Sequence, residues 1–320
     1  MNALKILVCF KVTPDFEALR EADWVAGAAV PPGAAGPAGV AAGVETRYVP
    51  RVFNCFDESA LETALRLYEA APGPGAGPEG ASAAAAECVT AAGGGTAPAR
   101  DAPGGDAAGV ALAALSIGGP EADPFLKTLQ ALGYRPTIRV RADANLDFAP
   151  DVVASIIEGC VRRVAHSDLL LLGCRSGPGD SGTVPFLAAE RLGWPCLTQV
   201  TEVERAGADR VRVAYVADDG PARVTVRLPC VLAVGNAVVS RLRVPTLSAR
   251  LAQRGARIEE VDAADLGVDV AAGLERRTCV LTGLEAIDRR RQGIVIGGGS
   301  PREKARALFD RHLRERIERL

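Results

Sequence analysis

The apolar run Asp168–Leu172 is followed by a glycine-rich loop and then by a helix-forming segment, and this succession constrains the fold most strongly. Its leucines are continuous, as in a strand buried on both faces of a parallel sheet. Earlier apolar runs of strand length alternate with segments of helical spacing. The expected strands are Leu4–Phe10, Val110–Ile117 and Thr137–Arg141, and the expected helices are Asp57–Ala70, Pro124–Leu132, Asp151–Ala165 and Thr183–Leu192. This alternation predicts an α/β fold with a doubly wound, mostly parallel, Rossmann-like sheet.

The first expected helix, Asp57–Ala70, has a clear periodic pattern. Apolar residues stand at positions i, i+3, i+4 and i+7 of one helical face, namely Leu61, Ala64, Leu65 and Tyr68. Ser59 and Glu62 have the spacing of a capping box, so we expect them at the start of this helix.

The pattern changes after Trp194, where short strands follow one another with tight turns between them. These strands are 197–204, 210–216, 221–228 and 230–235, and we expect hairpins at an edge of the sheet. The chain ends in a basic helix, Arg302–Leu320, with a narrow apolar stripe formed by Ala305, Leu308, Phe309, Leu313 and Ile317. Such a stripe favours an arm that docks on a partner subunit.

Two segments, 26–44 and 71–108, are rich in alanine, glycine and proline and almost free of large apolar side chains. They bury too little surface to offset the entropy lost on ordering, so we expect mobile loops. The domain prediction is therefore a nucleotide-binding α/β domain over residues 1–262, with these two loops, and a docking arm over residues 263–320.

Charge and composition exclude several classes of protein. The net charge is −2 and aromatic residues make up 4%, which argues against nucleic-acid binding. The eight cysteines form no C-x-x-C pair and the chain has two histidines, so we expect no metal site. No apolar run reaches the roughly 20 residues that span a bilayer, and no cleavable signal pattern occurs at the start. We expect a cytoplasmic protein.

In open α/β sheets, ligands bind beyond the carboxyl ends of the strands. The most informative strand end is the loop from Gly173 to Thr183, because its four glycines allow positive φ and close approach of a ligand to the backbone. Ser181 or Thr183 can cap the next helix, whose N-terminus attracts phosphate, and Arg175 can add a charged contact. A nucleotide phosphate and a tight turn without a ligand are both consistent with this loop.

Four segments, taken in order, resemble the β (small) subunit of electron transfer flavoproteins. The stretch from Asp168 to Pro195 aligns with the family pattern without a gap and includes Asp180-Ser181-Gly182 and Leu192-Gly193-Trp194-Pro195. Lys5–Lys11 with Pro14-Asp15 resembles the family's opening. Phe53–Glu62 resembles its Asn-Pro-Phe-Asp-Glu motif, and Asp265–Asp269 with Arg290–Ile296 resembles its C-terminal arm.

The resemblance implies a Rossmann-like sheet of the adenine-nucleotide-hydrolase type and an electron carrier rather than an enzyme. It implies a heterodimer with an α subunit that holds most of an FAD, and an AMP in the small subunit. The complex would relay electrons from acyl-CoA or other flavin dehydrogenases to a membrane quinone oxidoreductase. The residues implied around the nucleotide are Cys9 (backbone), Asn54, Phe56, Asp57, Ile117, Gly173, Arg175, Asp180, Ser181, Gly182, Thr183 and Val184.

The sequence also departs from the family pattern, which leaves alternatives open. Gly179 is small, as in the branch of the family that binds a second FAD in place of AMP. The stretch Ala237–Leu247 lacks the Asn-Glu-Pro core of the family's partner-recognition segment, in which Val238 or Leu242 would be the apolar anchor. A stand-alone adenine-nucleotide-binding module and a partner protein with a decayed site are the other two readings.

Overall fold

The computed structural model of the chain describes residues 3–19, 40–41, 44–45, 48–71, 109–142, 144–177, 181–237, 240–277 and 293–319. It divides into two compact units, Met1–Leu284 and Glu285–Leu320. The first unit therefore extends past residue 262, where we expected the nucleotide-binding domain to end, and docking by residues 263–320 stays a prediction. Apart from Val40–Ala41, Val44 and Ala71, both low-complexity segments lie outside the described residues.

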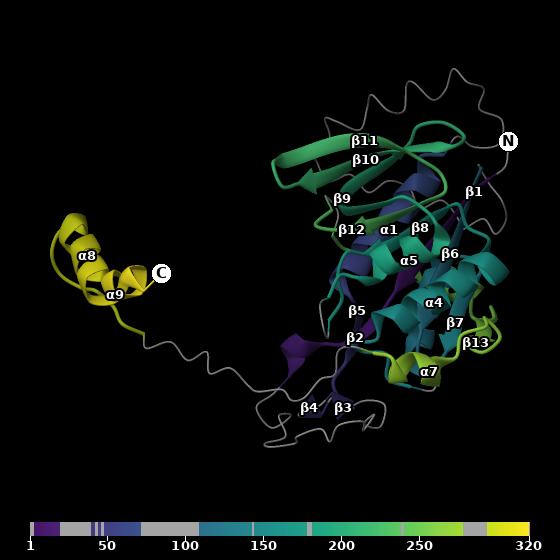
Figure 1. Ribbon diagram of the computed structural model, residues 1–320, viewed down its shortest axis with the longest axis horizontal. Helices are drawn as coiled ribbons and strands as arrows, with labels where there is room; N and C mark the ends of the chain where they lie inside the picture. Colours follow the sequence, from purple (N-terminus) through teal and green to yellow (C-terminus); the bar gives the residue numbers. More distant parts are fainter. Residues whose placement is uncertain are drawn as a thin grey trace. The chain divides into compact units, whose positions relative to one another are not determined.

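The first unit is built on a sheet whose described strands follow the order β11-β10-β9-β12-β8-β1-β6-β7-β13 (Figure 1). Their bounds are β1 Leu4–Phe10, β6 Val110–Ile117, β7 Thr137–Arg141, β8 Leu169–Gly173, β9 Cys196–Arg205, β10 Arg210–Ala217, β11 Gly220–Arg227, β12 Cys230–Val234 and β13 Glu259–Asp262. All neighbours from β9 to β13 in this order pair in parallel, which confirms the predicted mostly parallel α/β sheet. Two small antiparallel pairs join β2 (Val12–Pro14) to β5 (Arg51–Phe53) and β3 (Val40–Ala41) to β4 (Val44–Glu45).

The strand order reverses next to β1. The chain leaves β1 in one direction for β6 and β7, then returns across β1 to β8 and β12. β1 and β8 are in parallel register, with Ile6 opposite Leu169 and Val8 opposite Leu171. Such a reversal opens a crevice at the carboxyl ends of the two strands, where ligands bind in this class of sheet.

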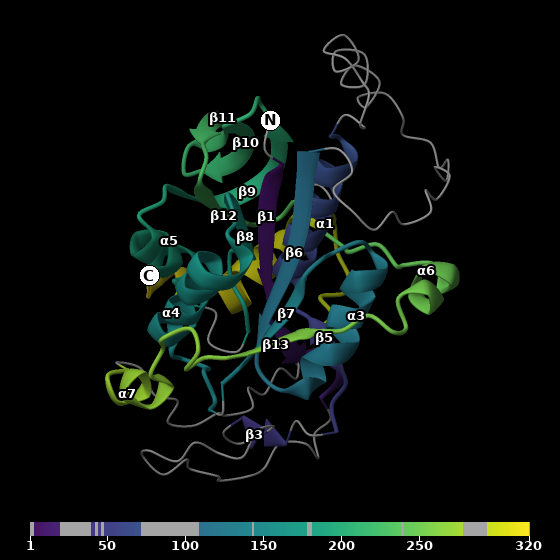
Figure 2. The same cartoon turned by 90° about the vertical axis from the view of Figure 1, so that its right-hand side faces the viewer.

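Helices cover both faces of the sheet (Figure 2). α1 (Cys55–Glu69) and α3 (Asp123–Ala131) pack on one face, and α4 (Pro150–Cys160) and α5 (Val184–Leu192) pack on the other. A hydrophobic core lies on each face of the sheet, and successive residues of β1 point alternately into the two cores. Ile6 and Val8 face α1, and Leu7 faces α4. Burial of each such side chain contributes roughly 1.5–3 kcal/mol, so the two cores together hold the helices against both faces of the sheet.

The start of α1 differs from the prediction. The helix begins at Cys55, four residues before Ser59, and no capping box forms there. The Ser59 hydroxyl instead donates to the Cys55 carbonyl oxygen inside the helix (3.2 Å). Asn54 occupies the N-cap position, and its side chain is engaged elsewhere. The capping-box prediction was wrong because the helix begins at Cys55, which places Ser59 within the helix rather than at its N-cap.

The antiparallel strands β9, β10 and β11 form the expected edge of the sheet. β12 does not belong to these hairpins. It runs parallel between β8 and β9, with Cys230 opposite Leu169 and Val234 opposite Gly173. All five of its residues are buried, which is the burial pattern of an internal parallel strand, so our hairpin prediction for 230–235 was wrong.

Past β12 the first unit continues through α6 (Leu247–Ala252), β13 and α7 (Val270–Glu275). The second unit contains α8 (Pro301–Leu308), a π-helical turn (Phe309–Leu313) and α9 (Arg314–Glu318). The helix predicted over Arg302–Leu320 is thus present, with a capping box in which Ser300 and Glu303 bond each other's backbone N–H groups. Its large apolar residues Leu308, Phe309 and Ile317 are exposed.

Candidate functional site

The carboxylate of Asp57 bridges the carboxyl ends of β1 and β8. Its Oδ2 accepts a hydrogen bond from the Lys11 backbone N–H, and its Oδ1 accepts one from the Gly173 backbone N–H, each at 2.8 Å. Asp57 is buried in the first turn of α1, where the helix dipole favours negative charge. One side chain therefore joins α1 to the ends of both strands at the reversal of the sheet.

Burial raises the pKa of Asp57 from 3.8 to about 6, against the two backbone hydrogen bonds, which lower it. The carboxyl group is thus mostly ionised at neutral pH but takes up a proton only slightly below it. A buried carboxyl group whose pKa is shifted in this way, at the ligand edge of a sheet, marks a candidate functional position.

Gly173 allows α1 to approach this strand end closely. A Cβ atom on Gly173 would lie 2.4 Å from the Asp57 Oδ1 and 2.8 Å from the Phe56 Cβ. Beside it, the Asn54 side-chain amide donates to the Arg175 carbonyl oxygen (2.8 Å). The structure therefore brings together five of the predicted site residues: Asn54, Phe56, Asp57, Gly173 and Arg175.

The start of α5 offers hydrogen-bond donors at the same loop. Thr183 occupies the N-cap position, but its hydroxyl lies 3.1 Å from the Ser181 hydroxyl and makes no cap hydrogen bond. The first hydrogen bond within the helix joins the Leu187 N–H to the Thr183 carbonyl oxygen. In the part of the chain that the structure describes, the Val184 and Phe186 N–H groups therefore have no partner. Two such groups at a helix N-terminus suit an anionic oxygen.

Gly182 sets the direction of the chain into α5. Its φ of 63° lies in the left-handed region, and a Cβ there would lie 3.1 Å from the Cys174 carbonyl oxygen. The turn needs glycine on both counts. A left-handed glycine turn followed by uncapped helix donors fits a phosphate group.

The remaining predicted residues have simpler positions. Cys9 lies one residue before the end of β1, with its side chain buried on the α4 face of the sheet, and burial raises the pKa of its thiol well above the usual range. Ile117 ends β6 and is half-buried. The side chain of Arg175 is exposed. Asp180 lies outside the described residues, and the ligand contacts of the predicted residues stay predictions.

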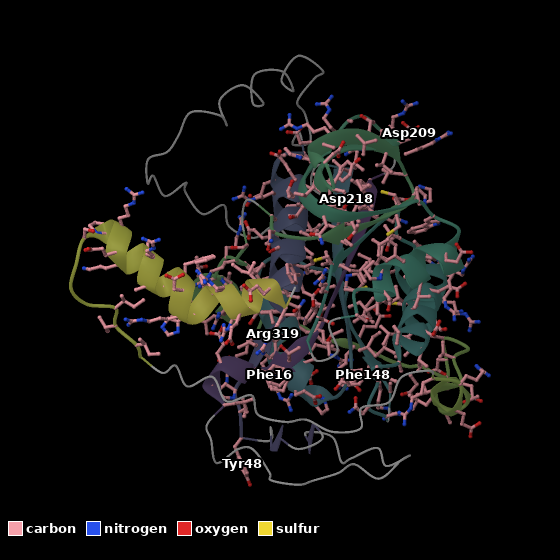
Figure 3. All side chains as sticks on the ribbon, turned by 60° about the vertical axis from the view of Figure 1, so that its left-hand side comes forward. Phe16, Tyr48, Phe148, Asp209, Asp218 and Arg319 are labelled. Atoms are coloured by element: carbon pink, nitrogen blue, oxygen red, sulfur yellow. The ribbon has the colours of Figure 1, made fainter. Side chains whose placement is uncertain are left out.

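Three further residues at this edge, Lys11, Asp147 and Phe16, were not among the predicted site residues. The Lys11 ammonium forms an ion pair with Asp147 (2.6 Å), which ties the end of β1 to the loop before α4. Phe16 is 40% exposed, and a Cβ on Gly177 would lie 4.0 Å from its ring. Figure 3 shows Phe16 and Phe148 at the same end of the first unit, away from Asp209 and Asp218. Lys11 belongs to the opening motif and Phe16 directly follows its Pro14-Asp15, so their position in the sequence was the available signal.

Comparison with known proteins decides the family. The model of the electron transfer flavoprotein domain matches residues 104–266. YgcR of Escherichia coli (strain K12), whose name assigns it provisionally to the electron transfer flavoprotein subunits, is 35% identical over 211 residues, which are 65% of this chain and 76% of YgcR. The electron transfer flavoprotein subunit beta of Bradyrhizobium diazoefficiens (strain USDA 110) is 28% identical over 240 residues, 74% of this chain and 79% of the relative. The subunit beta of Bacillus subtilis (strain 168) is 27% identical over 161 residues, 50% of this chain and 62% of the relative.

The chain belongs to the electron transfer flavoprotein beta-subunit family. The resemblance found in the sequence is thereby confirmed.

In this electron transfer flavoprotein subunit, the segment after β12 is held against α1. The Arg243 guanidinium donates to both carboxylate oxygens of Glu62, at 2.6 to 3.2 Å, and also binds Glu69. Leu242 packs against the core beside α1, so it does not protrude as an apolar anchor. The exposed apolar residues here are Val244, Leu247 and Leu251, and Val238 lies outside the described residues.

None of the flavoprotein subunit's described helices is both long and apolar enough to cross a membrane.

Proposed function

We propose that this chain is the small subunit of an electron transfer flavoprotein, that it pairs with a larger alpha subunit, and that it holds an adenine nucleotide at the reversal of its sheet. The observation that carries the proposal is the uncapped start of α5, directly after a left-handed Gly182, beside a crevice bridged by Asp57. Donors placed in this way serve phosphate groups in related sheets.

The proposed roles follow from where these residues lie. The backbone N–H groups of Val184 and Phe186 hold the phosphate, with the Ser181 and Thr183 hydroxyls beside them. Asn54, Phe56 and Asp57 contact the adenosine from the start of α1, Ile117 lines it, and the backbone at Cys9 and Gly173 closes the crevice. Asp180 completes the phosphate loop.

The flavin is the redox group in this proposal. FAD, held mostly by the alpha subunit, supplies reversible one-electron and two-electron chemistry when it is bound. This chain acts as part of an electron carrier rather than as an enzyme, between acyl-CoA or other flavin dehydrogenases and a membrane quinone oxidoreductase. The exposed Phe16 ring, at the carboxyl edge of the sheet, lies where a companion flavin domain can cover it.

Co-expression with an alpha subunit, followed by purification, tests the proposal. We expect a yellow one-to-one heterodimer that releases one FAD and one AMP on denaturation, as identified by mass spectrometry. Replacing Asp180 and Ser181 by alanine together is expected to reduce the AMP content and the thermal stability before it alters the flavin spectrum. A colourless monomer that binds ATP would instead identify a stand-alone nucleotide-binding module.

The same measurement separates the remaining alternatives. Two FAD molecules per heterodimer and no AMP would identify a subunit with a second flavin in the crevice. A heterodimer with neither AMP nor a second FAD would mean that the site of this chain has lost its ligand.

A further inference from the structure

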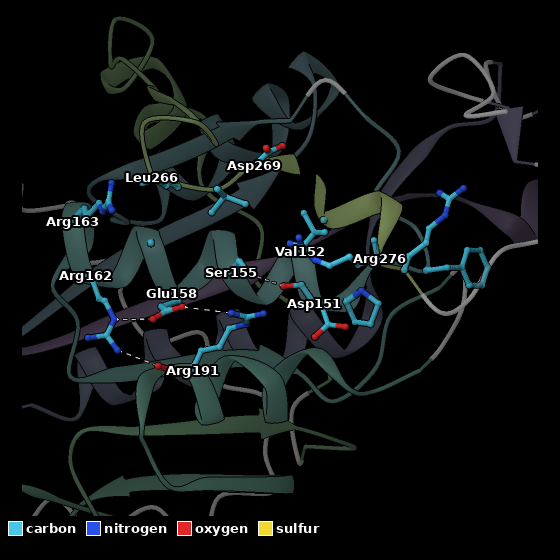
Figure 4. Close-up of a pocket in the computed structure, with 18 residues that line it drawn as sticks. Asp151, Val152, Ser155, Glu158, Arg162, Arg163, Arg191, Leu266, Asp269 and Arg276 are labelled. Atoms are coloured by element: carbon cyan, nitrogen blue, oxygen red, sulfur yellow. Dashed lines mark hydrogen bonds and ion pairs between the residues drawn. The ribbon is translucent and has the colours of Figure 1, made fainter. Parts of the chain in front are cut away.

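A cavity of about 600 Å³ lies along α4 (Figure 4) and is lined by none of the predicted nucleotide-site residues. One wall is α4 with its π-helical turn, and the other is the segment Leu266–Arg277, which includes α7. Arg191, at the end of α5, adds to the wall next to Glu158. The volume lies within the range of sites that receive a ligand or a short peptide segment.

Close packing at two glycines fixes the walls relative to each other. A Cβ on Gly159 of α4 would lie 2.8 Å from the Leu266 Cβ, and a Cβ on Gly273 of α7 would lie 2.6 Å from the Val152 Cγ2. The segment 266–277 therefore sits directly on α4, and the cavity above this contact is a built groove of the first unit.

Arginine dominates the lining of the groove. Five arginines face three acidic residues there; they are Arg162, Arg163, Arg191, Arg276 and Arg277, against Asp151, Glu158 and Asp269. The whole chain carries a net charge of −2, so this local excess of positive charge is a feature of the groove and not of the surface in general.

Two of the three carboxylates are already engaged. Glu158 lies between Arg162 (3.0 Å) and Arg191 (4.0 Å). Asp269 caps α7 by accepting a hydrogen bond from the Ala272 N–H (3.0 Å). Asp151 is the one acidic lining residue whose carboxylate has no such engagement among the described residues.

The arginines, by contrast, keep donors for an additional partner. Arg163 uses one N–H for the Asp265 carbonyl oxygen (3.0 Å), which leaves four of its five. Within the described part of the chain, no carboxylate lies within ion-pair distance of Arg276 or Arg277. These guanidinium groups are suited to carboxylates, which they bind in a two-pronged geometry.

The spacing of the charges favours an extended segment over a small anion. Arg162 and Arg163 lie at one end of α4, whereas Arg276 and Arg277 follow α7, which packs at Val152 near the other end. Val152 and Arg163 are eleven positions apart, which is roughly 16 Å at 1.5 Å per residue. An extended chain covers that length in about five residues. A single phosphate cannot reach both groups of arginines.

We propose that this groove is the docking site for an extended segment of the alpha subunit that carries two carboxylate side chains four to five positions apart. One carboxylate binds at Arg163, and the other binds at Arg276 and Arg277. This inference rests on the proposed function, because it needs the alpha subunit as the partner.

Charge reversal tests the proposal through the rate of assembly. Arg276→Glu combined with Arg277→Glu is expected to lower the association rate constant with the alpha subunit about tenfold and to flatten its dependence on salt, since interface charges act mainly on encounter. Arg210→Glu combined with Arg227→Glu, on the β10–β11 hairpin, is the matched control and is expected to behave as the wild type. Equal rates for the groove variant and the control would overturn the proposal.

A photo-crosslinking residue at Ser155, inside the groove, tests the local contact independently of folding effects. We expect a crosslink to an alpha-subunit peptide that contains two acidic residues with the stated spacing. A crosslink to a peptide without them, or none in an intact heterodimer, overturns the groove assignment alone. A wild-type chain that forms no heterodimer overturns the proposed function as well.

Discussion

The Asp57 carboxylate and the Gly173 backbone N–H are joined by a 2.8 Å hydrogen bond across 116 residues of sequence, at the point where the order of the sheet reverses. The same carboxylate binds the Lys11 N–H at the end of the neighbouring strand. The first turn of α1 is therefore part of the ligand edge, and the edge cannot rearrange without moving α1.

Replacing Asp57 by alanine is expected to lower the free energy of unfolding by about 2 kcal/mol, because the Lys11 and Gly173 N–H groups lose their acceptor in a buried place. Urea denaturation followed by circular dichroism measures the effect. Asp209→Ala, in an exposed turn, is the matched control and is expected to change stability by less than about 0.5 kcal/mol. Equal midpoints for the two variants would contradict this role of Asp57.

The raised pKa of Asp57 predicts a pH dependence with a definite sign. Its pKa is about 6 in the folded chain and 3.8 without burial, so the folded state binds more protons between these values. The stability supplied by protonated Asp57 is full below pH 4 and is lost as the pH rises through 6, by an amount of roughly 3 kcal/mol. The free energy of unfolding, measured at unit steps from pH 4 to 7, should show this decline in the wild type and lack it in Asp57→Ala.

Gly173→Ala tests the close approach of α1 to β8. The added methyl group would lie 2.4 Å from the Asp57 Oδ1, so α1 has to shift, at an expected cost of about 1–3 kcal/mol. Gly255→Ala is the control, since a Cβ there meets no atom within 4 Å. The melting temperatures of the two variants should differ by several degrees. Coincident unfolding curves would show that α1 shifts away from the added methyl group at little energetic cost.

Much of the fold follows from local sequence. β1, β6 and β7 begin and end where their apolar runs predict, because strands buried on both faces consist of little else. The start of α1 was predicted two residues too late, at Asp57 rather than Cys55. The contact of the N-cap residue Asn54 could not be predicted locally, since its side-chain amide donates to the Arg175 carbonyl oxygen, 121 residues away, and does not cap the helix. The place of β12 between β8 and β9 likewise depends on pairing between distant strands.

The candidate site was also predicted only in part, because some of its contacts join segments that lie far apart in the sequence. Glycine and hydroxyl residues after β8 predict a phosphate turn from their own spacing. The structure gives Gly182 a left-handed conformation and shows no partner for two N–H groups at the start of α5 among the described residues, while phosphate binding there stays a prediction. The bridge from Asp57 to Gly173, and the ion pair of Lys11 with Asp147, join segments whose proximity only the folded sheet determines. Local patterns carry no information about such pairs.

Arg243 and Glu62 are also far apart in the sequence, and breaking their contact is expected to lower the stability of the fold strongly. Glu62 is buried, with 4% of its side chain exposed, and Arg243→Met removes its guanidinium partner. The carboxylate keeps only the backbone N–H of residue 243 (3.2 Å) and the weaker Arg66 contact at 3.5 Å among the described residues. We expect a loss of about 2 kcal/mol, since removing the main partner of a buried charge is costly. Adding Glu62→Gln should restore part of the loss. Arg212→Met, which breaks an exposed ion pair with Glu204, is the control and is expected to have an effect below about 0.5 kcal/mol.

Gly182→Ala tests the phosphate turn through the stability that AMP confers. AMP at a hundred times its dissociation constant should stabilise the wild type by about 2.7 kcal/mol, because it binds the folded state alone. The variant forces a side chain into a left-handed position, 3.1 Å from the Cys174 carbonyl oxygen, and so displaces the start of α5. We expect the AMP-induced rise in melting temperature to fall by more than half. Gly220→Ala is the matched control, because Gly220 also has a positive φ but is the first residue of β11, at the distant β10–β11 hairpin. Both variants lose some intrinsic stability through backbone strain, so a smaller AMP response in Gly182→Ala alone reports on the phosphate and not on strain. An undiminished response in that variant would place the phosphate somewhere other than the start of α5.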